Sequence, residues 1–341
     1  MRYIGSKANL LPEIQSVVTK YAPSAHSFCD LFAGTGVVGQ LFKSTHKVIS
    51  NDILYFSFVI NAALIGLSGQ PQFTRLRKEL GSDPVEFLNG LKVDLNKATD
   101  ADLAVREFSP AGHACRAYFT AANAYRIDKM RQRLNQWREA DLLTDEEHLY
   151  LLAALLMEIP SVSNIAGTYG AFLKHWDKRA HKPIEVKHLK ILASKDQNQV
   201  FNEDANSLIR RLSGDVIYID TPYNSRQYSS NYHVLETIAR YDFAELKGVT
   251  GTRVDSVGKS DYCQVARVEN AFRDLFANCN FGHAVVSYSS DGLVTRKDLE
   301  SIIGTTFKPR ILETREIPYR RYRRLSGDNR ELFEYLIVAS R

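Results

Sequence analysis

A strand, a glycine-bearing loop and a helix follow one another near the start of the chain, and they restrict the fold more than any other segment. Residues 27–32 form an apolar run that enters the loop, and residues 37–42 continue as a short helix. A second strand is predicted at 47–50 and ends at Asn51-Asp52. This order of elements is typical of a β-α-β unit in a parallel sheet.

The remaining pattern predicts an α/β fold in which a sheet is interrupted by helices. Further strands are expected at 200–201, 215–219, 283–288 and 334–338, whereas long helical stretches run from about 60 to 190. One predicted helix has a single apolar face made by Ile127, Met130, Leu134 and Trp137. We therefore expect a doubly wound sheet domain of 1–62 plus 190–341, with a mostly helical inserted domain at 63–189.

The composition fits a protein of the reducing cytoplasm. With 341 residues, 44% of them hydrophobic, the chain can bury one large core or two smaller ones. Its four cysteines lie far apart without metal-ligand spacing, so no metal site is expected. The start of the chain lacks the apolar region of a signal peptide, and the longest apolar stretch, 149–157, is too short to cross a membrane.

The tetrapeptide Asp220-Thr221-Pro222-Tyr223 directly follows the predicted strand at 215–219. It therefore falls at the carboxyl edge of the sheet, where open α/β sheets bind ligands. An acid, a carbonyl before proline and an aromatic ring suit one task, which is to hold an amino group attached to a flat ring.

The loop at 32–36 predicts a nucleoside cofactor. Its glycines, Gly34 and Gly36, allow a tight turn between strand and helix, although this pattern alone is weak. Asp52 lies at about the distance expected for an acceptor of ribose hydroxyls. Asp30, just before the loop, favours a cationic ligand such as S-adenosylmethionine over a pyrophosphate.

Two further segments have alternative interpretations. Asp204 follows a strand and is predicted either to contact an adenine amino group or to cap the helix that begins behind it. At the amino terminus, Tyr3 and Lys7 flank a glycine turn, where the lysine can hold a carboxylate such as the methionine end of that cofactor.

Basic residues indicate a polyanionic partner. The net charge is +5, and residues 296–330 contain ten Lys/Arg against five Asp/Glu. In that stretch, tyrosines alternate with Arg320, Arg321, Arg323 and Arg324, which predicts phosphate contacts or, alternatively, a solvated β-hairpin arm. The polar loop at 163–170, with Asn164 and Tyr169 and followed by Lys174, is predicted to face a partner, with an ordinary connector as the alternative.

In their order, these motifs resemble those of the D12 class of N6-adenine-specific DNA methyltransferases, the Dam-like type. The resemblance covers nearly the whole chain, and the target-recognition region of the family would lie between 52 and 203. The elements that carry it are 2–7 (Arg-Tyr-Ile-Gly-Ser-Lys), 32–36, 51–52, 203–205, 220–223, 232–237 and 286–289, with Tyr322-Arg323 late in the chain.

The resemblance implies a Rossmann-like sheet of the S-adenosylmethionine-dependent methyltransferase type and methyl transfer to a flipped-out adenine in double-stranded DNA. Asp220 and the main-chain carbonyl of Thr221 would accept hydrogen bonds from the N6 amino group, and Tyr223 would stack on the base. Cofactor contacts would come from Tyr3, Lys7, Asp30, Phe32, Gly34, Gly36, Asp52, Asp204 and Asp220. Such enzymes are encoded by bacteria or phages.

One departure leaves alternatives open. The family usually has proline at the position of Thr221, and threonine makes the loop less rigid because proline fixes φ. An adenine methyltransferase acting on RNA, and a DNA-binding pseudoenzyme with weak catalysis, are the main alternatives. Enzymes that modify a glutamine amide carry asparagine where this chain has Asp220. Two settings stay open for such an enzyme, one in which it accompanies a cognate restriction endonuclease and one in which it acts alone.

Overall fold

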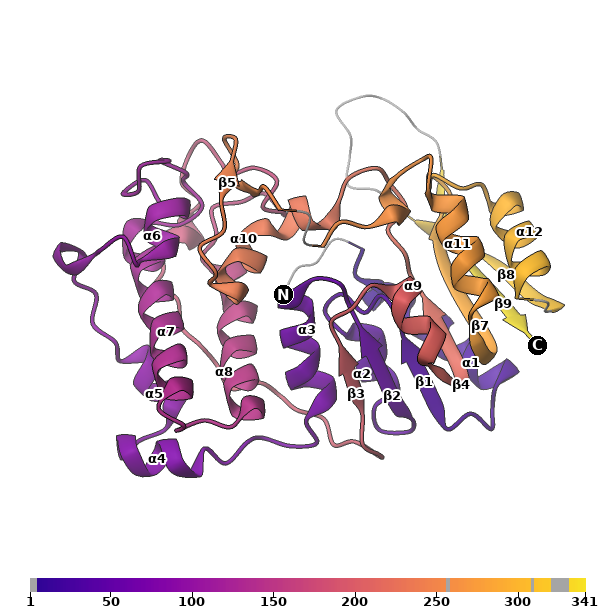
Figure 1. Cartoon of the computed structure of the whole chain (residues 1–341), viewed down its shortest axis with the longest axis horizontal. Coiled ribbons are helices and arrows are strands. Elements are labelled where there is room, and N and C mark those ends of the chain that lie inside the picture. The colour runs from indigo at the N-terminus through magenta and orange to yellow at the C-terminus, as the bar shows by residue number, and fades with distance from the viewer. Residues whose placement is uncertain (1–4, 256–257, 308–309, 320–330) are drawn as a thin grey trace. The chain divides into compact units, whose positions relative to one another are not determined.

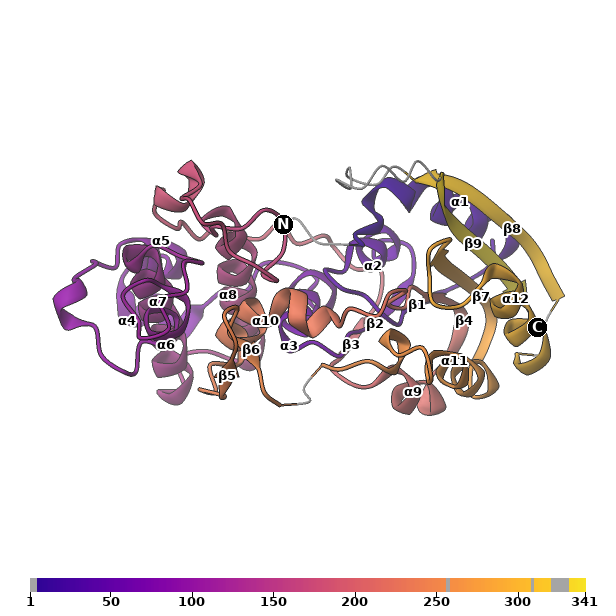
Figure 2. The ribbon, with the colours of Figure 1, turned by 90° about the horizontal axis from the view of Figure 1, so that it is seen from above.

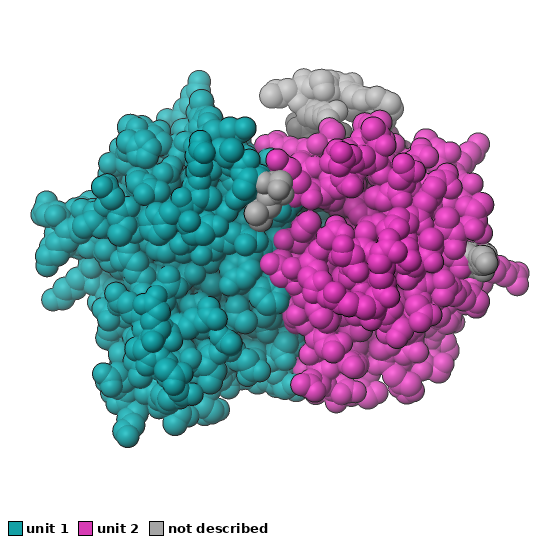
Figure 3. Space-filling view, viewed as in Figure 1, with its two compact units in different colours: residues 1–6, 54–193, 228–258 teal, residues 7–53, 194–227, 259–341 magenta. Residues whose placement is uncertain are grey.

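The computed structural model of the chain (Figure 1) describes residues 5–255, 258–307, 310–319 and 331–341. The chain divides into two compact units, each made of three separate segments (Figure 3). The first unit contains 1–6, 54–193 and 228–258, and the second contains 7–53, 194–227 and 259–341.

The second unit contains a mostly parallel sheet, so the chain has a mixed α/β fold. Among the described residues the strand order is β3-β2-β1-β4-β7-β9-β8. The pairs from β3 to β7 are parallel, whereas β9 runs antiparallel to both β7 and β8. The strands are β1 Ser27–Asp30, β2 Lys47–Asn51, β3 Gln199–Phe201, β4 Ser213–Ile219, β7 Asn280–Ser289, β8 Arg310–Tyr319 and β9 Leu332–Ser340.

The predicted strands are confirmed, and the strand β8 was not predicted. It lies at the edge of the sheet, and its charged residues, among them Glu313 and Arg315, interrupt the apolar pattern on which strand prediction depends. Charged side chains are common on edge strands because they oppose pairing with another chain. The stretch from 296 onward is therefore the helix α12 (Arg296–Thr306) followed by β8, and the arginines at 320–324 lie outside the described residues.

Helices cover both faces of the sheet, which is why its strands are apolar on both sides. The helices α1 (Leu11–Tyr21) and α2 (Val37–Phe42) lie on one face, and α9 (Ala205–Leu208) and α11 (Val268–Ala277) lie on the other (Figure 2). Successive side chains of β1 point to opposite faces of the sheet. The ring of Phe28 stacks on Phe42 of α2 with 4.0 Å between centroids, whereas Cys29 joins the core cluster that includes Phe272 and Leu299.

The first unit is built mainly from helices. Its long helices α7 and α8 lie side by side (Figure 1), and the predicted apolar face of α7 is buried. Thr144 and Glu147 form a capping box that fixes the start of α8. The helices are α3 Tyr55–Asn61, α4 Thr74–Leu80, α5 Pro84–Asn89, α6 Leu103–Phe108, α7 Ala121–Glu139, α8 Asp145–Glu158 and α10 Tyr228–Arg240, with a hairpin of β5 Leu246–Lys247 and β6 Thr252–Arg253.

Short elements complete both units. Residues Ala62–Gly66 form a π-helical turn, η2, directly after α3. The 3-10 turns are η1 Lys7–Leu10, η3 Leu95–Lys97, η4 Ile159–Ser161, η5 Lys178–His181, η6 Ile209–Arg211 and η7 Asp261–Cys263. In the part of the chain that the structure describes, no helix has the length and apolar character needed to cross a membrane.

The first unit includes the predicted insertion but extends beyond it. The unit starts at residue 54 rather than 63, and it also takes in 228–258, which the sequence analysis assigned to the sheet domain. The buried carboxylate of Glu236 explains this difference. It accepts hydrogen bonds from the backbone nitrogens of Tyr55 and Phe56, at 3.0 and 2.9 Å, and so joins α10 to the start of α3.

Candidate active site

Three neighbouring parallel strands of the second unit end at one edge of the sheet, and each has an acid there. Asp30 ends β1, Asp52 follows β2 and Asp220 follows β4. In the register of the sheet, Asp30 lies between Ser50 of β2 and Tyr218 of β4. The structure therefore brings the predicted cofactor acids and the predicted catalytic acid to the same edge.

The loop after β1 has the backbone of a tight glycine turn. Gly34 and Gly36 have φ values of +53° and +74°, in the left-handed region that favours glycine, and Gly36 caps the start of α2. The nitrogen of Gly34 donates a hydrogen bond to Asp52 at 2.8 Å. Phe32 is half-buried, and its ring meets Tyr262 edge-on at 5.3 Å, so much of its side chain belongs to the core.

Asn51 has a role at this edge that the sequence analysis did not assign. Its side chain is buried and bonds to both backbone groups of Glu203, at 3.1 Å each, and to the carbonyl of Leu31 at 3.1 Å. The residue thus fastens together the segments that follow β1, β2 and β3. In the sequence, the signal for this role is a polar residue at the end of an apolar strand.

Asp30 is a buried acid in a negatively charged surrounding. It is 1% exposed and accepts a hydrogen bond from the backbone nitrogen of Gly39 at 3.1 Å. Burial raises the pKa of Asp30 to about 8, and the nearby charges of Asp220 and Asp52 act in the same direction. A cationic ligand at this edge would favour the ionised form of the Asp30 carboxyl.

Asp220 belongs to an ionic cluster at the end of β4. The ammonium of Lys7 lies 2.9 Å from Asp220 and 3.2 Å from Glu334 of β9, and Ser287 of β7 donates to Glu334 at 2.6 Å. Burial lowers the pKa of Lys7, but the two carboxylates outweigh it and hold that pKa well above its usual value. Burial raises the pKa of Asp220 to about 6, against the opposing effect of Lys7.

The cluster gives Lys7 partners other than those predicted. The sequence predicts that Lys7 can hold a cofactor carboxylate, whereas its ammonium lies between two carboxylates of the chain itself. Tyr3, predicted beside it, lies outside the described residues. A contact of either residue with a cofactor stays a prediction.

The rest of the tetrapeptide is partly enclosed. Thr221 is 2% exposed, and its hydroxyl has no hydrogen-bond partner within the described residues. Pro222 and Tyr223 are half-buried, and Tyr223 packs against the core cluster while its carbonyl accepts from Leu293 at 2.9 Å. The hydroxyl of Thr221 is thus a buried polar group in the segment where a substrate is expected.

Asp204 adopts one of its two predicted roles. Its carboxylate accepts a hydrogen bond from the backbone nitrogen of Ser207 at 3.0 Å, so it is the N-cap of α9. The residue is exposed, and a contact with an adenine amino group stays a prediction.

Of the three DNA-binding residues predicted in the first unit, Lys174 alone is exposed. Asn164 is 1% exposed, and its amide bonds to the backbones of Ala117, Leu173 and Asp177. Tyr169 is equally buried, with its hydroxyl 2.9 Å from that of Ser163. The burial argues against direct contacts by Asn164 and Tyr169, because their polar groups already hold the loop together.

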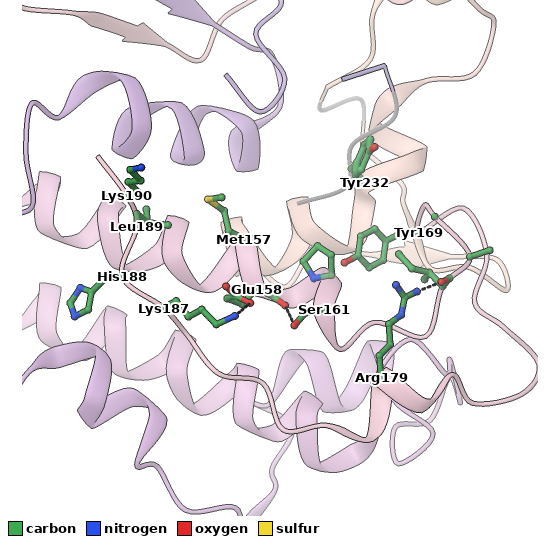
Figure 4. Close-up of a pocket in the computed structure, with 14 residues that line it drawn as sticks. Met157, Glu158, Ser161, Tyr169, Arg179, Lys187, His188, Leu189, Lys190 and Tyr232 are labelled. Carbon is green, nitrogen blue, oxygen red and sulfur yellow. Dashed lines mark hydrogen bonds and ion pairs between the residues drawn. The ribbon is translucent and has the colours of Figure 1, made fainter. Parts of the chain in front are cut away.

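A pocket of about 530 Å³ lies beside the carboxyl end of α8 in the first unit (Figure 4). Two of its exposed basic side chains have acidic partners: Lys187 is 3.5 Å from Glu158, and His188 is 3.1 Å from Asp83. The rim therefore carries both signs of charge rather than a purely basic patch. Ile165, Gly167, Tyr169, Arg179, Lys190 and Tyr232 complete much of its wall.

No metal site is found in the part of the chain that the structure describes. There, no group of three or more His, Cys, Asp or Glu side chains is placed to hold an ion. None of the four cysteines forms a disulfide in the described part of the chain: Cys29, Cys263 and Cys279 are buried and Cys115 is exposed.

Comparison with known proteins identifies the class to which this fold and this site belong. The family model described as D12 class N6 adenine-specific DNA methyltransferase matches residues 3–291. The chain belongs to this family.

Named relatives agree with that assignment. Type II methyltransferase M.FokI of Planomicrobium okeanokoites is 44% identical over 338 residues, which are 98% of this chain and 52% of that protein. Modification methylase StsI of Streptococcus sanguinis is 41% identical over 100% of this chain and 52% of its own length. Type II methyltransferase M.NlaIII of Neisseria lactamica is 35% identical over 99% of this chain and 98% of its own. The chain thus spans about half the length of the first two relatives and nearly all of the third.

Proposed function

We propose that this chain is a site-specific DNA methyltransferase that transfers a methyl group from S-adenosylmethionine to the N6 nitrogen of a flipped-out adenine. The observation that supports it most is the common edge of β2, β1 and β4, where Asp52, Asp30 and Asp220 meet. In this proposal the second unit is a Rossmann-like catalytic domain of the methyltransferase type. The helical segment at 63–189 of the first unit is its target-recognition region.

The residues of this edge fit the proposed cofactor. Asp52, at the end of β2 and bonded to Gly34, suits ribose hydroxyls. The buried carboxyl of Asp30 suits a cationic group, since a positive charge beside it favours its ionised form. S-adenosylmethionine, when bound, supplies an electrophilic methyl group on a sulfonium. Phe32 and Asp204 would border its adenine, and Tyr3 and Lys7 its carboxylate.

Asp220 and Thr221 supply the chemistry of the acceptor side. The carboxylate of Asp220 and the main-chain carbonyl of Thr221 accept one hydrogen bond each from the N–H groups of the N6 amino group. This pulls the nitrogen lone pair out of the ring and directs it at the methyl carbon, so that positioning and electrostatics lower the barrier. Extruding the base costs about a few kcal/mol, and stacking on Tyr223 offsets about 1–3 kcal/mol of that cost.

Double-stranded DNA is the proposed partner. The exposed Lys174 and the basic stretch with Arg320, Arg321, Arg323 and Arg324 are candidates for phosphate contacts. Two of the relatives are named modification methylases and two others type II methyltransferases. By analogy, the methylation protects DNA from a cognate restriction endonuclease.

The test is transfer of labelled methyl from S-adenosylmethionine to duplex DNA by the full chain. Asp220→Ala should abolish transfer, whereas Asp261→Ala, which changes an exposed acid of the same unit, should leave it intact. Undiminished transfer by Asp220→Ala would overturn the proposed role of Asp220. Preference for RNA over duplex DNA in a competition assay would redirect the substrate assignment. Cofactor binding without transfer to any DNA would identify a pseudoenzyme.

A further inference from the structure

The ionic cluster of Lys7, Asp220 and Glu334 carries two carboxylates for one ammonium. The side chains of these residues are 7%, 16% and 7% exposed, so water and salt screen their interactions only weakly. Lys7 lies closer to Asp220 than to Glu334, at 2.9 against 3.2 Å, and it is shared by both. The cluster therefore has a net charge of about −1 when all three groups are ionised.

The position of Glu334 is fixed by the sheet. It lies on β9, which pairs antiparallel with β7, and the fully buried Ser287 of β7 donates to its Oε1 at 2.6 Å. The same oxygen faces the ammonium of Lys7. One carboxylate oxygen thus receives both contacts, and its orientation toward Lys7 is set from two sides.

We propose that Glu334 is a positioning residue for methyl transfer, which keeps the Asp220 carboxylate a strong hydrogen-bond acceptor by drawing the Lys7 ammonium partly toward itself. Glu334 acts through Lys7 and need not touch base or cofactor. The inference rests on the proposed function of Asp220. It concerns a residue beyond 291, where the match to the family model ends.

The charges around Asp220 give the direction of the effect. The groups that act on it or on its partner are Lys7, Glu334, Asp30 and Tyr218. The negative charge of Glu334 raises the pKa of Asp220, and Lys7 lowers it. When Glu334 is neutralised, the ammonium of Lys7 interacts with Asp220 alone. The pKa of Asp220 then falls, and its carboxylate becomes a weaker hydrogen-bond acceptor.

Glu334→Gln tests this, because glutamine keeps the shape and can still accept from Ser287. Single-turnover methyl transfer is measured from about pH 5 to about pH 9 with saturating cofactor and DNA. In Glu334→Gln we expect the acidic limb of the pH–rate profile to move to lower pH by about one unit and the plateau rate to fall about tenfold. The KM values should stay within about twofold of those of the unmodified chain. Glu334→Asp, which restores the charge, should return the limb toward that of the unmodified chain. Ser287→Ala should act in the direction of Glu334→Gln, but less.

Glu269→Gln, an exposed change on α11, is the matched control and should match the unmodified chain throughout. The proposal would be overturned if the acidic limb of the pH–rate profile does not move in Glu334→Gln. This holds if the rate stays the same, and it also holds if the rate falls together with the melting temperature, which is the result that a purely structural role predicts.

A second measurement separates this inference from the proposed function. In protein labelled with ¹³C at aspartate carboxyls, the resonance that disappears in Asp220→Asn reports the titration of Asp220 without any turnover. Its midpoint should be lower in Glu334→Gln and unchanged in Glu269→Gln. If the unmodified chain methylates no DNA, the proposed function fails, while an equal midpoint in Glu334→Gln and the unmodified chain would refute the role of Glu334.

Discussion

Asp52 accepts a hydrogen bond from the backbone nitrogen of Gly34, with 2.8 Å between the two atoms. The contact joins two features that the sequence separates, the acid after β2 and the glycine turn after β1. Because the amide holds one oxygen, the carboxylate has a fixed orientation at the edge where a nucleoside is expected to bind.

Asp52→Asn should weaken binding of S-adenosylmethionine by about tenfold or more, since hydrogen bonds to a charged group contribute about 1.5–3 kcal/mol. The amide oxygen of asparagine still accepts from Gly34, so the melting temperature should change little. Calorimetric titration with the cofactor measures the affinity. Asp261→Asn serves as the control, and equal affinities for the two variants would contradict the assignment of Asp52.

Affinity for the cofactor should rise with pH because of Asp30. Its pKa of about 8 means that the carboxyl is mostly protonated at neutral pH, and a cationic ligand must displace that proton. Binding should therefore release protons and tighten as the pH increases from about 7 to about 9. Calorimetry in buffers of different ionisation enthalpy counts the protons. Binding by Asp30→Asn should release fewer protons and depend less on pH in this range, because only the amino group of the cofactor then titrates near about pH 8. An unmodified chain that releases no more protons than Asp30→Asn would refute the prediction.

The same raised pKa affects stability in the opposite sense. The ordinary pKa of an aspartic acid is 3.8, and that of Asp30 in the folded state is about 8, so between these pH values the folded state binds more protons at Asp30 than the unfolded state does. The contribution of Asp30 to the free energy of unfolding therefore falls as the pH rises through this range.

Thr221→Val should leave the fold intact and stabilise it by about 1 kcal/mol, because it removes a buried hydroxyl that has no partner within the described residues. Methyl transfer should continue, since the proposed acceptor at this position is the main-chain carbonyl. Thermal unfolding and the transfer assay check both expectations. Thr221→Ser, which keeps the hydroxyl and loses the methyl group, should be less stable than either. A destabilised valine variant would mean that the hydroxyl has a partner after all, such as an ordered water.

Glu236→Ala should destabilise the first unit by about 3 kcal/mol. The change leaves the first amides of α3 without their acceptor and removes the carboxylate that lies 2.7 Å from Arg240. Thermal unfolding followed by circular dichroism measures the loss. Glu139→Ala, at the exposed end of α7, should change the melting temperature little. Similar melting temperatures for both variants would contradict a structural role for Glu236.

Local patterns predicted much of the sheet and of its ligand edge. Strands that are buried on both faces are continuously apolar, as at 215–219 and 283–288, and such runs are visible in a sequence. Asp30, Asp52 and Asp220 each end or follow a predicted strand, and in the structure these three strands are parallel neighbours that share their carboxyl ends. Such an arrangement depends only on the order of neighbouring elements.

Contacts between distant segments were not predictable in this way. Lys7 and Glu334 come from opposite ends of the chain, and no local pattern states that their charges meet. The loop at 163–170 illustrates a different limit. Its polarity is compatible with a loop that faces a partner and with an ordinary connector, and in the structure Asn164 uses its amide to satisfy backbone groups, as buried loops require. Sequence alone does not distinguish these two uses of a polar residue.

The position of β9 in the sheet has a consequence for synthesis on the ribosome. Proteins emerge from the amino terminus, so Lys7, Asp220 and Ser287 leave the exit tunnel before Glu334 does. Because β8 joins the sheet through β9, neither of these two strands can take its place until β9 has emerged. The edge strand β8 and the carboxylate of Glu334 therefore take their positions in the sheet at the same stage. A nascent chain can form the glycine turn early, but it acquires the full charge balance around Asp220 only after β9 has emerged.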